Sequence, residues 1–190
     1  MKSLESIYNS ILLEAQNPNN IDLNLLKKCV DGTYTINDDG SIDVNGDVNL
    51  NNKKLAKIPF KFRNVSGGFY CHRNRLTSLE GAPNTVGGNF CCNDNRLTSL
   101  EGSPNTVGGG FYCYNNKLTT LEGAPNTVGG SFYCYGNSNL SYSELFKIVD
   151  TVKRDIYYSN VTTPEDKYKI RRDRDVKNVL KDDELGDLDV

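Results

Sequence analysis

The chain has 190 residues, of which 37% are hydrophobic and 24% charged, and this is enough for one ordinary domain. Its 22 Lys and Arg residues against 24 Asp and Glu give a formal net charge of -2, which argues against a positive field that attracts nucleic acid or an anionic membrane. Because no apolar run approaches the roughly 20 residues that span a bilayer, and Met1–Ala15 lacks the basic and unbroken apolar regions of a signal peptide, we expect a cytosolic protein.

Residues 1–32 are expected to form an N-terminal helical cap. Apolar residues recur at helical spacing from Ser3 to Ala15, and Asp22 is placed to cap a second short helix that runs to Val30. Helices this short are not stable alone, so they should pack on the next element. They either cover the open end of a repeat array or present their apolar stripe to a partner. The apolar alternation from Thr33 to Asp43 then predicts a hairpin.

A 21-residue repeat occupies most of residues 33–139. The units keep apolar residues at the same positions, although the first unit differs from the others in sequence. A fixed period of this length is typical of a solenoid in which each turn stacks on its neighbours. The sequence therefore predicts parallel β coils, about five in number, with helical caps at both ends. The coils are expected to begin near Val44, Val65, Val86, Val107 and Val128.

The phases of one unit predict the role of each side chain. In Phe111–Tyr114 the alternation predicts a short strand with Phe111 and Cys113 inward and Tyr112 and Tyr114 outward. An asparagine follows each such strand at the bend, where an asparagine ladder would satisfy unpaired backbone groups. The ladder comprises Asn74, Asn95, Asn116 and Asn137.

The rest of the unit returns to the next strand. Leu118 and Leu121 point into the core, and Gly123 and Pro125 favour an extended return segment rather than a helix. The pair Gly108–Gly109 then turns the chain into the following strand. Either a positive φ or a close backbone approach would exclude a larger residue at this pair.

Residues 140–160 are expected to form a C-terminal capping helix. Its apolar stripe has helical spacing, and a serine near Ser141 or Ser143 is suited to its start. Residues 161–190 read as a charged helix followed by an acidic tail, only weakly anchored to the rest.

The cysteines repeat with the same period. The inward column packs as reduced, buried thiols; a metal or redox role is the alternative, but the C-x-x-C spacing of zinc sites is missing and the chain has 1 histidine. We therefore expect no metal and no cofactor. Cys91 should face outward and be the thiol that reacts. The inward column comprises Cys71, Cys92, Cys113 and Cys134.

Two columns of charge follow from the same phases. Like charges aligned along a stack repel, so these columns are expected to solvate the coils and oppose aggregation. Alternatively, the basic column grips an acidic partner or phosphates. The basic column comprises Lys54, Arg75, Arg96 and Lys117, and the acidic column Glu80, Glu101 and Glu122.

The repeat V-G-G-x-F-x-C-x-x-N-x-L-T-x-L-E-G-A-P resembles the short bacterial leucine-rich repeat, and more closely resembles repeat proteins encoded by tailed bacteriophages. The resemblance covers about Ile36 to Asn139 and differs from leucine-rich repeats in the Gly-Gly pair and in one extra residue before Phe. It implies a curved parallel sheet with a concave binding face, a phage origin, and a location in the host cell cytoplasm. It carries no catalytic motif.

These features together predict a non-enzymatic protein-binding module. No nucleophile lies beside a base, and no phosphate-binding glycine loop occurs in a strand-to-helix setting. The expected partner is a bacterial host protein, such as a defence component, that is inhibited or redirected; the alternative is a structural or accessory component of the phage particle. Outward tyrosines are enriched at binding surfaces, although they also stack across strands. The candidate binding residues are Tyr70, His72, Asn93, Tyr112, Tyr114, Tyr133 and Tyr135.

Overall fold

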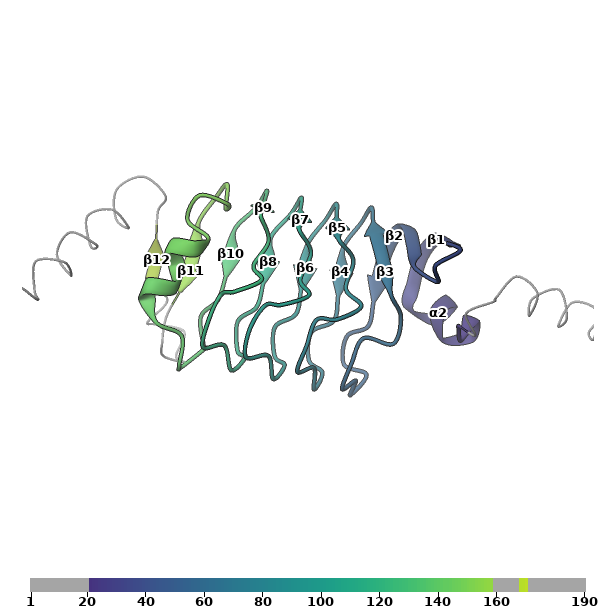
Figure 1. Ribbon diagram of the computed structural model, residues 1–190, viewed down its shortest axis with the longest axis horizontal. Coiled ribbons are helices and arrows are strands. Elements are labelled where there is room, and N and C mark those ends of the chain that lie inside the picture. The colour runs from purple at the N-terminus through teal and green to yellow at the C-terminus, as the bar shows by residue number, and fades with distance from the viewer. Residues whose placement is uncertain (1–20, 159–167, 171–190) are drawn as a thin grey trace, which may run out of the picture.

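A computed structural model describes residues 21–158 and 168–170 and shows a parallel β-solenoid. The coils lie side by side along the long axis of the molecule (Figure 1). The fold class expected from the repeat is thereby confirmed. Full coils begin at the five predicted valines, and an incomplete sixth begins at Val152, which bridges to Val128.

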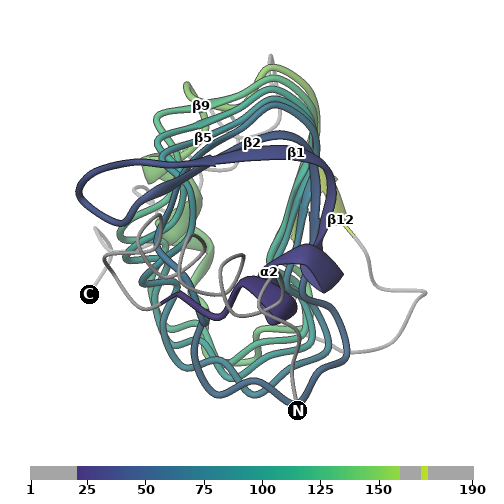
Figure 2. The same cartoon turned by 90° about the vertical axis from the view of Figure 1, so that its right-hand side faces the viewer.

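The four coils that begin at Val65, Val86, Val107 and Val128 each carry two short strands, where the sequence predicted one. The two sets of strands form adjacent sides of the coil: β5 (Thr85–Val86) and β9 (Thr127–Val128) lie along the top of Figure 2, and β12 (Tyr168–Ile170), at the end of the other set, lies at the right. One parallel ladder follows the inward valines and consists of β3 (Phe62–Val65), β5 (Thr85–Val86), β7 (Thr106–Val107) and β9 (Thr127–Val128). The other follows the inward phenylalanines and consists of β4 (Phe69–Tyr70), β6 (Phe90–Cys91), β8 (Phe111–Tyr112) and β10 (Phe132–Tyr133). The longer β2 (Ile42–Asn49) pairs with both β3 and β4 and so joins the ladders.

The Gly-Gly pairs form the corner between the two ladders. A Cβ atom on Gly108 would overlap the carbonyl oxygen of Gly87 in the preceding coil, and one on Gly129 would overlap that of Gly108. Close backbone approach is therefore the reason for glycine here. The left-handed φ is used instead by the glycine after each Glu, as at Gly102 with φ +80°.

The core consists of columns of identical residues. Four phenylalanine rings stack from coil to coil with centroid separations of 5.5, 5.2 and 4.9 Å. The inward cysteines and both leucines of every full repeat are buried beside them. Burial raises the pKa of the inward thiols well above the ordinary value, which keeps them neutral. The stacked rings are Phe69, Phe90, Phe111 and Phe132.

The predicted asparagine ladder is present at the bend. Asn116 is a representative rung: its Nδ2 donates to the carbonyl oxygens of Cys113 and Cys92 at 3.1 Å each, and its Oδ1 accepts from the backbone N–H of Leu97 at 3.1 Å. Asn95 repeats this pattern one coil earlier with Cys92 and Cys71. Each amide therefore satisfies groups on two coils that the bend leaves unpaired.

The residue before each ladder asparagine adopts a left-handed backbone, which the sequence analysis did not predict. Arg73 and Asp94 both have φ +54°, Asn115 has φ +53°, and Gly136 has φ +69° at the same position. A left-handed conformation is costly for a residue with a Cβ, so the bend stores some backbone strain in the coils that carry Arg and Asp here.

The N-terminal end is closed by helix α2 (Leu23–Cys29) and strand β1 (Val30–Ile36). The predicted N-cap, Asp22, accepts hydrogen bonds from the N–H groups of Asn24 and Leu25. β1 pairs antiparallel with β2 over its whole length, so the hairpin begins at Val30 and crosses the boundary expected between residues 32 and 33. The helix expected from Ser3 to Ala15 lies outside the described residues.

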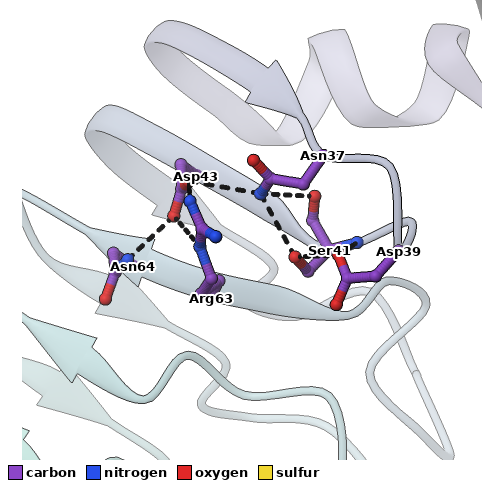
Figure 3. Close-up of polar contacts among 6 residues, drawn as sticks. All are labelled: Asn37, Asp39, Ser41, Asp43, Arg63 and Asn64. Carbon is purple, nitrogen blue, oxygen red and sulfur yellow. Dashed lines mark hydrogen bonds and ion pairs between the residues drawn. The ribbon is translucent and has the colours of Figure 1, made fainter.

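A polar cluster fixes this hairpin to the first coil (Figure 3). The Asp43 carboxylate accepts from the Arg63 guanidinium, from Asn64 Nδ2 at 2.9 Å and from Asn37 Nδ2 at 3.2 Å. These contacts, with Arg63 the strongest, lower the pKa of Asp43 to about 2. Asn37 Nδ2 also donates to the Ser41 hydroxyl, which closes the turn.

The C-terminal segment differs from the helix expected over residues 140–160. It forms a short 3-10 helix, η1 (Tyr142–Lys147), and then strand β11 (Ile156–Tyr158), which pairs parallel with β10. Ile148 and Val152 are buried as core residues of a further coil. Pairing with the open edge of β10 satisfies backbone groups that a helix packed there would leave unpaired.

Beyond residue 160, only one element is described. Tyr168–Ile170 form strand β12, antiparallel to β11, where a charged helix was expected. The rest of that expected helix and the acidic tail lie outside the described residues.

A glutamate side chain completes the last full repeat. In the preceding coil the backbone N–H of Leu100 donates to the Glu122 carbonyl of the next coil. The corresponding N–H of Leu121 donates to Glu144 Oε2 at 2.8 Å, and Thr120 Oγ1 and Lys147 Nζ also contact that oxygen, at 2.8 and 2.9 Å. Glu144 thus replaces the missing backbone acceptor.

Candidate protein-binding face

The outward surface of the phenylalanine ladder, here called the tyrosine face, holds all the predicted binding residues. Because side chains alternate along a strand, the residues that flank the inward Phe and Cys form two outward columns. The first column is Tyr70, Cys91, Tyr112, Tyr133 and Tyr157, in register from β4 to β11. The second column is His72, Asn93, Tyr114 and Tyr135.

The tyrosine rings stack on one another over the C-terminal coils. Tyr112 and Tyr133 have ring centroids 4.6 Å apart and planes inclined by 5°, and Tyr133 and Tyr157 are 4.5 Å apart at 4°. Tyr114 and Tyr135 are 4.6 Å apart at 9°. The cross-strand stacking considered from the sequence is therefore present. Sequence reasoning missed Tyr157, because its coil follows the previous one after 24 residues instead of the regular spacing.

The rings of Tyr70 and Tyr112 lean along their own strands, over the glycine two positions earlier. A Cβ atom on Gly68 would overlap the hydroxyl of Tyr70, and one on Gly110 would lie 3.0 Å from the hydroxyl of Tyr112. Burial raises the pKa of Tyr112 above its ordinary value, and that of Tyr135 to about 12. The hydroxyls are therefore neutral at pH 7 and remain hydrogen-bond donors.

The first column is interrupted at Cys91, and the second at Asn93. Asn93 is only 5% exposed and its Nδ2 donates to Asp94 Oδ2 at 2.7 Å, so it forms part of the floor of the face. Cys91 faces outward as predicted but is half-buried, and burial raises its thiol pKa to about 12. Among the described cysteines Cys91 is the one that is not fully buried, so its expected role as the thiol that reacts stays a prediction; its raised pKa lowers the fraction of thiolate, the reacting form.

His72 lies within the second column as a neutral side chain. Its Nε2 is 3.4 Å from Asn51 Nδ2, whereas its buried Nδ1 has no hydrogen-bond partner among the described residues. Burial lowers the pKa of His72, and Arg73 lowers it further. A neutral imidazole beside an asparagine adds a hydrogen-bonding edge to the face without adding charge.

The described residues offer few groups with catalytic potential. Across residues 21–158 and 168–170, no group of three or more His, Cys, Asp or Glu side chains is placed to hold a metal ion. A groove of about 370 Å³ on the outer surface of β1, β2, β3 and β5 is lined by hydroxyl and amide side chains such as Thr35, Asn45 and Thr85. Its one carboxylate, Asp43, is already engaged by Arg63.

The charged columns predicted from the sequence lie on the surface. The residues of the basic and acidic columns are exposed along the array. Within the described part of the chain, no helix has the length and hydrophobicity of a membrane span.

Comparison with known proteins gives no family whose model matches the chain, and no curated protein or solved structure to which it is significantly similar. The functional inference therefore rests on the chemistry of the tyrosine face. That face combines stacked aromatic rings, neutral hydroxyls and a continuous hydrogen-bonded sheet beneath them.

Proposed function

We propose that the protein is a non-enzymatic protein-binding module and that the tyrosine face binds its partner. The observation that carries this proposal is the pair of stacked tyrosine columns on one sheet, with rings 4.5 to 4.6 Å apart. Tyrosine is enriched at protein interfaces because a large ring and a hydroxyl become ordered at little entropic cost.

The tyrosine face is ordered before any partner arrives. Each of the stacked rings, from Tyr112 to Tyr157 and in the pair Tyr114 and Tyr135, is held by its neighbour. The strands beneath them are held by the buried phenylalanine stack. A partner that binds such a face loses less free energy to side-chain ordering, since the rotamers are already fixed. This pre-organisation supports a binding role and needs no chemical step.

The partner that we propose is a protein of a bacterial host, inhibited or redirected in the host cytoplasm during phage infection. A defence component is one such protein. The support is the resemblance of the repeat to those of tailed-phage proteins, together with the lack of a catalytic constellation in the described residues. The net charge of -2 favours a protein over a nucleic acid. If the protein instead co-fractionates with intact virions and no host protein is recovered with it, a role in the particle replaces this proposal.

The test is a quadruple variant in which Tyr112, Tyr114, Tyr133 and Tyr135 are changed to Ser. It removes three stacked pairs, each worth a few tenths to about 1 kcal/mol, so we expect a folded protein of lower melting temperature. Tagged protein from expressing or infected cells is then compared with wild type for the host protein that co-purifies, identified by mass spectrometry. Capture should be lost.

The matched control changes outward residues of the other ladder, Thr85, Thr106 and Thr127, to Ser. This control should retain both the fold and the capture. Retained capture by a folded quadruple tyrosine variant would move the binding site away from the tyrosine face.

A further inference from the structure

The first column of the tyrosine face contains a gap one coil wide. Tyr70 and Tyr112 lie on either side of Cys91, two rungs apart. Rungs of a parallel sheet are spaced by about 4.8 Å, so these two rings are separated by roughly 9.5 Å. We call the space between them, above Asn89 and Cys91, the aromatic gap.

Both walls of the aromatic gap are aromatic faces without a ring partner. Tyr112 stacks on Tyr133 with one face, and its other face looks onto the gap. Tyr70 has no ring contact within the part of the chain that the structure describes, yet both rings lean in the same way over a glycine, Gly68 or Gly110. The two walls therefore have matching orientations.

The floor of the gap is fixed and only weakly polar. Asn89 takes the place that glycine has under Tyr70 and Tyr112, and its Oδ1 accepts from the Gly110 N–H at 2.8 Å. Beside it is the half-buried thiol of Cys91, which burial keeps neutral. The floor therefore carries no charge, and burying an apolar ring against it and between the two tyrosines is favourable.

We propose that the aromatic gap receives one aromatic side chain of the protein partner, which completes the column by stacking between Tyr70 and Tyr112. This inference rests on the proposed function of the tyrosine face. A ring placed midway lies about 4.8 Å from each wall, close to the 4.5 and 4.6 Å measured between the tyrosines of the same column. The gap thus has the width of one planar ring.

The charges around the gap favour a side chain over a nucleobase. Asp47 acts electrostatically on Tyr70, and Asp94 on the nearby Tyr114, and in both cases the carboxylate contributes to a raised tyrosine pKa. Arg73 is the basic residue that acts on Tyr114. Two carboxylates against one guanidinium repel the phosphates that accompany a base.

The aromatic gap can be closed by giving its coil the glycine and tyrosine that the two neighbouring coils have at these positions. The variant Asn89→Gly/Cys91→Tyr places a tyrosine over a glycine, as in the coils on either side. Asn89→Gly alone is the matched control, because it removes the same amide but leaves the gap open. Both variants should keep native spectra, and the closed variant should melt no lower than its control.

The probe is N-acetyl-tryptophanamide, titrated into 15N-labelled full-length protein and followed by NMR. In the wild type, we expect shift changes concentrated on the backbone amides of Tyr70, Cys91 and Tyr112. The Asn89→Gly variant changes the floor but leaves the gap open, so its affinity is the reference for the closed variant. The closed variant should weaken binding at least tenfold. Equal binding by the closed variant and its control, or no shift changes at these amides in the wild type, would overturn the inference.

Two further measurements separate this inference from the proposed function. If the closed variant still captures the partner and the quadruple tyrosine variant does not, the tyrosine face binds without using the gap. If both variants capture it, the proposed function fails as well. A single-stranded thymidine oligonucleotide that displaces the probe at lower concentration than a tyrosine-containing peptide would overturn the choice of a protein side chain.

Discussion

Replacing Asn116 by Asp removes two donors from the asparagine ladder while keeping the shape of the side chain. At pH 7 the carboxylate still accepts from the Leu97 N–H, but it no longer donates to the carbonyl oxygens of Cys92 and Cys113, both 3.1 Å away. Each carbonyl keeps a second donor, Asn95 for Cys92 and Asn137 for Cys113, so the substitution removes two hydrogen bonds of roughly 0.5 to 1.5 kcal/mol each and leaves neither carbonyl unpaired. We therefore expect a loss of about 1 to 3 kcal/mol, a measurable part of the 5 to 15 kcal/mol that is typical of a domain.

The same substitution should make stability depend on pH with a defined sign. When protonated, the carboxyl group introduced by Asn116→Asp carries one O–H that can donate to a carbonyl, so folding raises its pKa above the ordinary aspartate value of about 3.9. Its contribution is then fully present below about pH 4 and is lost as pH rises through the folded-state pKa. Wild-type Asn116 has no such titration.

Urea unfolding from pH 3 to 8, followed by circular dichroism, checks both statements. The comparison is the difference in unfolding free energy between Asn116→Asp and wild type at each pH, with Asn84→Asp, an exposed site in the same array, as control. The difference should grow with pH for position 116 and stay small and flat for position 84. A flat, small difference at position 116 would refute the proposed role of the ladder.

Three further outcomes are expected. Leu118→Ala should cost about 2 to 5 kcal/mol in urea unfolding, because Leu118 is fully buried in a core shared by neighbouring coils; an unchanged midpoint would contradict its placement. Arg73→Gly should raise stability by about 0.5 to 1 kcal/mol by relieving the left-handed φ of +54°, and a lower melting temperature would argue against strain there. Burial raises the pKa of Glu144, but its bonds from Lys147 and the Leu121 N–H outweigh this and lower it; Glu144→Gln should therefore destabilise above about pH 5, with the difference shrinking as pH falls through the lowered pKa.

The repeated part of the fold was predictable because each inward position recurs in several repeats. The Phe, Cys and Leu positions recur at one phase, so chance apolar residues are averaged out and the core columns are unambiguous. The strand at Thr106–Val107 was missed because two residues are too few to show alternation. The left-handed bend was missed although Asp94, Asn115 and Gly136 are residue types that favour a positive φ, because Arg73 at the same position is not one of them.

The C-terminal end misled sequence reasoning for a different reason. Leu145, Ile148, Val152 and Ile156 are spaced by three and four residues, which is the pattern of an amphipathic helix. In the structure the same residues line an irregular coil whose valine follows Val128 by 24 residues. The spacing of apolar residues alone does not distinguish an amphipathic helix from such a coil. The deciding interaction is backbone pairing with a strand far away in sequence.

The tyrosine columns were predictable as outward residues, but their geometry was not. Alternation places Tyr112 and Tyr114 on one surface, whereas the parallel stacks depend on rotamers shared between neighbouring coils. The burial of Asn93 and of the Cys91 thiol depends on the larger side chains next to them. Neither the ring stacking nor this burial follows from the repeat sequence alone.

The strict alternation of the strand separates the inward side chains of each coil from its outward side chains, so the two sets can vary independently. In the four coils that begin at Val65, Val86, Val107 and Val128 the inward residues Phe, Cys and Asn are the same, and the first three also share their two leucines. The outward residues change from Tyr to Cys and from His to Asn to Tyr. Substitutions in the outward set leave the buried columns and the backbone ladder untouched. The outward surface can therefore change coil by coil while the scaffold stays constant, so that one 21-residue unit duplicated or exchanged within the array gives a new surface on the same fold.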